Sequence, residues 1–205
     1  MKILALELSS SIGSIAWIDD AADPFSTTFA NDRKHSGLFF ENLERCLLRF
    51  GNPELIVVGL GPGSYAGTRI AIATAIGLEA ASGARLLGLP SISAVDTDAK
   101  TYAVIGDARR QTFFFAEVRD RSCVTDSILL SEAELNDRLQ SFDGAVFTTE
   151  PLPAFPSATV SRPSAFLLAQ LAQRSPQRSL SAPLEPIYLR EPHITQAKVP
   201  VSFPT

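Results

Sequence analysis

The sequence predicts an α/β protein made of two related halves, of which the second is the smaller. Apolar runs at residues 3–8 and 14–18 flank a small polar turn and predict an opening β-hairpin. A strand, a helix and a second strand over residues 55–89 predict a parallel β-α-β unit. A polar stretch follows, and a new set of short apolar runs then opens a second part. We therefore expect an N-terminal domain at residues 1–98, a smaller C-terminal α+β domain at 99–190 and a loosely ordered tail at 191–205.

After the hairpin, an Asp/Pro break at residues 19–24 precedes a third short strand at 26–29 and a helix at 35–50. At 100° per residue, six apolar side chains of this helix fall on one arc and predict a core-facing stripe: Phe39, Phe40, Leu43, Cys46, Leu47 and Phe50. Leu38 and Leu48 fall outside the arc. They suit either ordinary exposed positions or a surface for a partner.

Three glycines in the loop after strand 55–60 raise the question of phosphate binding. The spacing of Gly61 and Gly67, and the absence of a following lysine, exclude a P-loop. Gly61 and Gly63 satisfy the G-x-G-x-x-A dinucleotide pattern, but no ribose-binding acid ends the next strand, and Pro62 removes a backbone donor. The favoured interpretation is a tight turn, with Ser64 in it, that lets the next helix pack closely.

The helix after this loop runs from residue 65 or 66 to Ser82 and ends at Gly83. Between Gly67 and Gly83 its only charged residues are Arg69 and Glu79, and small side chains surround it. Such a helix is expected to be covered on both sides, by the sheet on one and by something else on the other, for which a second subunit is a candidate. The residues proposed for that contact are Leu38, Leu48, Arg69, Ala73, Gly77 and Ala80.

The second half reads as strands at 102–105, 112–118 and 123–130, then a helix over 131–140 and a strand at 145–148. Ser131, with Glu134 three residues later, predicts a capping box for that helix. Pro163 is expected in the first turn of a last helix that ends near Arg174. A strand-like island follows at 187–189.

Composition excludes several classes of protein. The net charge of −4 and the pI near 5.2 make a wholly basic nucleic-acid-binding surface untenable, so any contact with RNA is local or indirect. Cys46 and Cys123 have no metal or redox spacing, and we find neither a secretory leader nor a membrane span, so a cytoplasmic protein is expected. His35 and His193 form no metal-ligand pair, so no metal is expected, and no serine lies in G-x-S-x-G.

Two polar segments are candidates for chemistry. Glu7 is followed by Ser9, Ser10 and Ser11, which suits either a carboxylate-and-hydroxyl phosphate loop or a polar hairpin turn. Asp107, Arg109 and Arg110 follow another strand and suit either a salt-bridged turn or a recognition patch.

Six short segments in this order resemble the bacterial TsaB family, the accessory subunits for making threonylcarbamoyladenosine in tRNA. They are ILALELS at 3–9, RKHS with His35 at 33–36, GPGSYAGTRI at 61–70, GLPSI at 88–92, DARR at 107–110 and PIYLR at 186–190. The resemblance implies two ribonuclease-H-like halves of the actin, sugar-kinase and heat-shock-chaperone superfamily, with the second half reduced. It is weakened at Glu7, where the family usually has aspartate, and at Gln111, where glutamate is common.

The resemblance also implies a function. A TsaB-like chain has no catalytic residues of its own and binds the transferase TsaD through the helices of its first half. It forms homodimers when alone, and a TsaE-type ATPase is a further implied partner. No cofactor is required, although ATP or ADP could bind at the junction with TsaD. Contact with tRNA is expected to be indirect.

Two other functions stay open at this point. One is a degenerate ATP-binding phosphotransferase or ATPase that uses Glu7 and residues 9–11 as its phosphate loop. The other is a homodimeric binding protein with an unrelated role.

Overall fold

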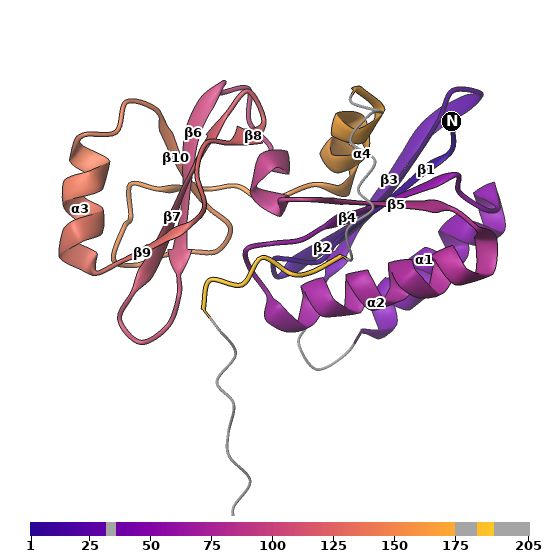
Figure 1. Ribbon diagram of the computed structural model, residues 1–205, viewed down its shortest axis with the longest axis horizontal. Coiled ribbons are helices and arrows are strands. Elements are labelled where there is room, and N and C mark those ends of the chain that lie inside the picture. The colour runs from indigo at the N-terminus through magenta and orange to yellow at the C-terminus, as the bar shows by residue number, and fades with distance from the viewer. Residues whose placement is uncertain (32–35, 175–183, 191–205) are drawn as a thin grey trace, which may run out of the picture.

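The computed structural model describes residues 1–31, 36–174 and 184–190, and it contains two mixed β-sheets with helices packed on them (Figure 1). The first sheet has the strand order β3-β2-β1-β4-β5. Its strands are β1 (Ile3–Glu7), β2 (Ile12–Asp19), β3 (Ala22–Ala30), β4 (Leu55–Gly59) and β5 (Arg85–Leu89). β2 is antiparallel to β1 and β3, whereas β4 and β5 run parallel to β1.

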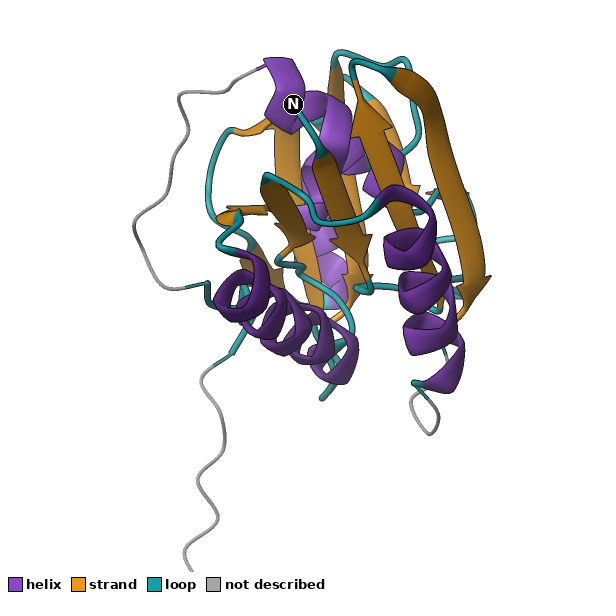
Figure 2. Cartoon of the chain, turned by 90° about the vertical axis from the view of Figure 1, so that its right-hand side faces the viewer, coloured by secondary structure: helices purple, strands orange, loops and turns teal. Residues whose placement is uncertain are grey.

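Helices cover both faces of this sheet, which explains why β1 and β4 are apolar on both sides. α1 (Gly37–Phe50) and α2 (Tyr65–Ser82) pack on one face, against Leu4, Leu6 and Val58 (Figure 2). α4 (Ala165–Arg174) packs on the other face, against Ile3, Ala5 and Val57. A short 3-10 helix, η1 (Ser91–Ala94), follows β5.

The second sheet repeats the strand order of the first. Its order is β11-β10-β6-β7-β8, with β9 also pairing with β7, so that β8 and β9 stand where β3 stands in the first sheet. Its elements are β6 (Thr101–Asp107), β7 (Phe113–Arg119), β8 (Ser122–Cys123), β9 (Ile128–Leu130), α3 (Glu132–Gln140), β10 (Ala145–Thr148) and β11 (Thr159–Val160). β7 is antiparallel to β6. β10 runs parallel to β6, and β11 runs parallel to β10. The expected α/β fold of two ribonuclease-H-like halves with a reduced second half is therefore confirmed.

The ends of the helices follow the expected chemistry. The Ser64 hydroxyl accepts a hydrogen bond from Gly67 N at the start of α2, and Gly83 ends that helix with a left-handed φ of 72°. Ser131 and Glu134 form the predicted capping box of α3.

Five local predictions were wrong. The strand expected at residues 123–130 is two short strands, β8 and β9, with no strand between them. Phe40 lies away from the core and is 48% exposed, because its position turns outside the stripe that Phe39 and Leu43 bury. β3 begins at Ala22, inside the expected break at residues 19–24, and runs through Pro24, which an edge strand tolerates. Pro163 precedes α4 and forms a bridge with Val95 instead of lying in the first turn. Residues 187–189 form no strand.

The division at residue 98 placed α4 with the second half, whereas the helix packs on the first sheet. Leu168, Ala169 and Ala172 are buried there among residues of β1, β2, β4 and β5. His35 and the tail at 191–205 lie outside the described residues.

Candidate functional site

A groove of about 970 Å³ lies between the two halves, at the carboxyl ends of β1, β6 and β10. Residues of the Ser9–Ser11 loop, the Gly63–Ala66 loop and the turn after β6 line it, together with Glu150 from beyond β10. Loops at the carboxyl ends of parallel strands are the usual place for ligands in α/β proteins. The structure therefore brings together the two loops and the Asp107–Arg109 segment that sequence reasoning had selected separately.

Glu7 ends β1, two residues before the groove-lining Ser9, and is fully buried. One carboxyl oxygen accepts a hydrogen bond of 2.6 Å from Ser9 N, and Oε2 has no hydrogen-bond partner among the residues that the structure describes. Burial raises the pKa of Glu7, and the nearby Ser9 and Ser91 offset only part of this effect. A Cβ on Gly59 would lie 1.8 Å from Oε2, so a glycine is needed there to make room for this carboxyl group.

The polar atoms of the loop after β1 are bound mostly within this chain. Ser10 Oγ donates to Ile12 O at 2.8 Å, and the Asn31 amide donates to Leu8 O and Ser10 O. Ser11 donates from N and Oγ to the two carboxylate oxygens of Glu150, at 2.7 and 2.9 Å. Within this loop, Ser9 Oγ is buried and has no partner in the described part of the chain.

Glu150 thus puts a carboxylate where a phosphate loop would hold its anion. Two donors of the loop bind Glu150, and a third, Ser9 N, binds Glu7. A phosphate at this loop would have to displace Glu150 against charge repulsion.

The glycines of the next loop serve close packing. A Cβ on Gly63 would lie 2.1 Å from Ser9 O, and a Cβ on Gly67 would lie 2.1 Å from Leu8 O. Ser64 N also donates to Ser9 O, at 2.6 Å. Gly61 has a φ of 89°, which a side chain would strain. These contacts press the start of α2 onto the end of β1, as expected for a tight turn.

Asp107 and Arg109 form the salt-bridged turn that was one of the two sequence interpretations. Asp107 accepts hydrogen bonds from Arg109 N at 2.7 Å and from the Arg109 guanidinium at 3.3 Å. Arg109, Arg110 and Gln111 all have left-handed φ values, of 67°, 56° and 58°. Both arginines are exposed, so the turn also presents two cations to solvent.

The residues proposed for partner contact are exposed positions of α1 and α2, the two helices that cover one face of the first sheet (Figure 2). Leu48 is 82% exposed, Leu38 is 46% exposed, and Arg69, Ala73, Gly77 and Ala80 are all exposed. Ile76 of α2 is exposed as well. A Cβ on Gly77 would meet nothing within 4 Å. We call this surface the α1–α2 face.

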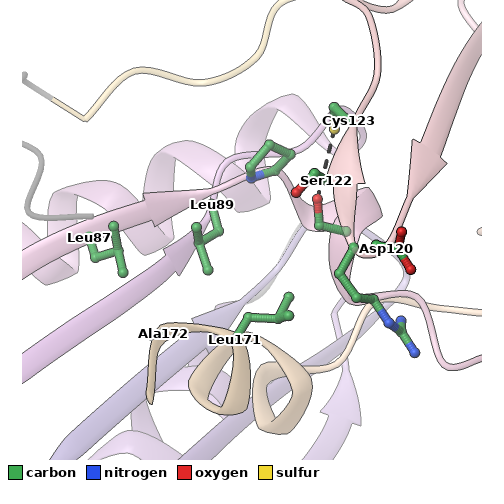
Figure 3. Close-up of a pocket in the computed structure, with 10 residues that line it drawn as sticks. Leu87, Leu89, Asp120, Ser122, Cys123, Leu171 and Ala172 are labelled. Atoms are coloured by element: carbon green, nitrogen blue, oxygen red, sulfur yellow. Dashed lines mark hydrogen bonds between the residues drawn. The ribbon is translucent and has the colours of Figure 1, made fainter. Parts of the chain in front are cut away.

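A second hollow, of about 310 Å³, lies between β5, α4 and the β7–β8 turn (Figure 3). Leu87, Leu89 and Leu171 make much of it apolar, and Cys123 Sγ lies 3.8 Å from Ser93 Oγ at its rim. Burial raises the pKa of the Cys123 thiol, which works against a nucleophilic role.

No cluster of three metal-binding side chains occurs within residues 1–31, 36–174 and 184–190. Across the same residues, no helix is both long and apolar enough to cross a bilayer.

Sequence reasoning missed Glu150 and Asn31, and it missed the contacts of residues 184–190. Topology offers a signal for Glu150, because it comes just after β10, which runs parallel to β6 and ends at the same edge as Asp107. The contacts of Asn31 depend on backbone carbonyls, which no side-chain pattern reveals.

The repeated strand order and the groove between the halves define an α/β protein of the ribonuclease-H-like class. A model of the family described as TsaD, tRNA N6-adenosine threonylcarbamoyltransferase, matches residues 33–145, which is more than half of the chain. The chain belongs to this family.

Two solved structures share the fold of this chain. YeaZ from Pseudomonas aeruginosa is 18% identical with a TM-score of 0.73, over 92% of this chain and 100% of that one. A protein from the same organism, described as similar to peptidase YeaZ, is 22% identical with a TM-score of 0.72, over 92% of this chain and 99% of that one. A search of curated proteins found no match.

Proposed function

We propose that this chain is a noncatalytic accessory subunit that binds a TsaD-type transferase and activates it in the threonylcarbamoyl modification of tRNA. The observation that carries the proposal is the α1–α2 face. It exposes Leu48, Ile76 and a row of small residues on α2. The other sides of α1 and α2 pack on the core of the first half. Contiguous apolar surface of this kind marks protein interfaces.

The chemistry of the groove supports a noncatalytic role. Glu7 is buried and its raised pKa favours the protonated form, so it is poorly placed to hold a metal ion or polarise water. The donors of the Ser9–Ser11 loop are largely bound to carboxylates of the same chain.

The experiment measures threonylcarbamoyl transfer to tRNA by the TsaD-type protein of the same organism, supplied with the preformed adenylate, with and without this chain. Ala73→Asp and Gly77→Asp each put a charge on the α1–α2 face. A Cβ at Gly77 meets nothing within 4 Å among the described residues beyond its own helix backbone, so the fold should tolerate a side chain there. Ala133→Asp makes the same kind of change on an exposed position of α3 and serves as the matched control.

We expect transfer to depend on the chain, and both α2 variants to lose most of that dependence while their circular dichroism stays unchanged. Ala133→Asp should activate like wild type. Transfer that proceeds equally without the chain would contradict the proposal. Loss of activation by Ala133→Asp as well would contradict the assignment to this face.

The groove volume favours one alternative, the binding of ATP or ADP by the isolated chain. Calorimetry with ATP and magnesium tests it. We expect no tight binding by wild type, because Glu150 already occupies the loop. Tight binding would favour the phosphotransferase or ATPase reading.

Further partners of the proposed complex are a second copy of this chain on the same face when TsaD is absent, and a TsaE-type ATPase. Sedimentation of the chain alone and with each partner tests both.

A further inference from the structure

Four arginines and two tyrosines form a strip beside the groove, which two of them, Tyr65 and Arg109, help to line. It begins on α2, crosses residues 184–190 and ends at the β6–β7 turn (Figure 1). Its members, which we call the arginine–tyrosine strip, are Arg69, Tyr65, Tyr188, Arg190, Arg109 and Arg110.

Direct contacts link the three segments that carry the strip. The Arg69 guanidinium lies 5.0 Å from the Tyr65 ring, and the rings of Tyr65 and Tyr188 are 5.6 Å apart. Arg190, two residues further on, donates to Arg109 O at 3.4 Å and to Thr112 Oγ1.

The strip is held in place and also open to solvent. Ile187 N donates to Leu60 O at 2.8 Å, Leu184 packs on the first core and Leu189 packs on the second-half core. Tyr65 and Tyr188 remain 52% and 42% exposed. A preorganised, exposed surface loses little entropy on binding.

The backbone of the β6–β7 turn points to a use for its side chains. Three consecutive residues, Arg109, Arg110 and Gln111, adopt the left-handed conformation that glycine or asparagine would adopt at less cost. Because arginine is costly at such positions, its presence suggests that the side chains at the tip of the turn have a function.

Charge favours an anionic partner. The protein as a whole has a net charge of −4, yet four arginines gather here. Within the strip's described segments the carboxylates are Asp107, which pairs with Arg109, and Glu185. Exposed tyrosines among arginines suit a ligand that has both phosphates and flat rings.

We propose that the arginine–tyrosine strip binds unpaired RNA, with the arginines on phosphates and the tyrosines stacked on bases. Because this rests on the proposed function, the RNA is the tRNA substrate, held beside the partner-binding face. Arg69 belongs to both surfaces, so the experiment uses the other end of the strip.

The experiment measures binding of labelled, unmodified tRNA by fluorescence anisotropy at several salt concentrations, with the chain alone and with its TsaD-type partner. Arg109→Gln/Arg110→Gln should weaken binding about 10-fold and reduce the slope of log K against log salt by about 1 to 2. Tyr188→Ala should weaken binding about 5-fold or more with an unchanged slope, and Tyr188→Phe should restore it.

Arg174→Gln, in the last turn of α4 on the other side of the first sheet, is the matched control and should bind like wild type. Wild-type affinity in the double variant, or no binding by wild type in either setting, would overturn the proposal. Equal binding of a blunt RNA duplex, or displacement by poly-glutamate at equal charge, would overturn it in favour of a general anion surface.

The transfer assay separates this proposal from the proposed function. If the chain activates transfer but the strip variants bind tRNA normally, only the strip assignment fails. If the strip variants lose tRNA binding but the chain does not affect transfer, only the accessory function fails.

Discussion

Replacing Gly63 and Gly77 by alanine should have opposite effects on stability, although both glycines lie in the same glycine-rich segment. At Gly63 the new Cβ would lie 2.1 Å from Ser9 O, whereas a carbon and a carbonyl oxygen ordinarily stay about 3.3 Å apart. The loop must therefore move by about 1 Å, which disturbs the hydrogen bond from Ser64 N to Ser9 O.

The cost combines about 1–3 kcal/mol for overpacking with about 1 kcal/mol for the hydrogen bond, so Gly63→Ala should lower the free energy of unfolding by about 2–4 kcal/mol. At Gly77 the Cβ meets nothing within 4 Å. There alanine should raise the free energy of unfolding by about 0.5–1 kcal/mol, because it suits a helix better than glycine does.

Urea unfolding followed by tryptophan fluorescence measures both changes. Trp17 is the only tryptophan, is fully buried and stacks on Phe50 at 5.3 Å, so its emission reports on the first half. A Gly63→Ala protein within about 0.5 kcal/mol of wild type would refute the packing argument. The packing argument would be refuted more strongly if, in addition, wild type bound nucleotide and the Gly63→Ala protein did not.

Three further predictions concern single groups. Because burial raises the pKa of Glu7, ionising it disfavours folding, so the free energy of unfolding should fall as pH rises above the ordinary value of 4.5 toward the raised pKa. Glu7→Gln should flatten this dependence in urea unfolding between about pH 5 and pH 8, and equal slopes would contradict the assignment. Ser131→Ala removes the capping box with Glu134 and should cost about 1 kcal/mol, seen as a lower urea midpoint by circular dichroism, and an unchanged midpoint would count against it. Burial raises the pKa of Cys46 to about 11, against an ordinary value of 9.0, so a thiol reagent should modify it at least about 100-fold more slowly in the folded protein than after unfolding, and similar rates would contradict its burial.

The sequence was sufficient for the elements whose signals are local. Ser64 and Gly83 mark the ends of α2, and the capping box marks the start of α3, because these residues bond to the backbone within one turn. The alternation of strands and helices likewise gave the parallel and antiparallel pairs of the first sheet.

Predictions that depended on distant segments failed more often. Phe40 fits a helical stripe, but the neighbouring strands do not cover it. Pro24 reads as a break unless the strand is known to be an edge. The approach of Glu150 to Ser11 spans 139 residues and depends on how the halves meet, which no periodicity encodes.

The position of α4 has a consequence for synthesis on the ribosome. Ile3, Ala5 and Val57 are synthesised early, whereas the helix that covers them begins at Ala165. Until that helix emerges, one side of the first sheet is a bare aliphatic surface, a state that attracts chaperones and self-association. The nascent chain therefore cannot mature half by half, and its last helix completes the hydrophobic layer that its first strand began.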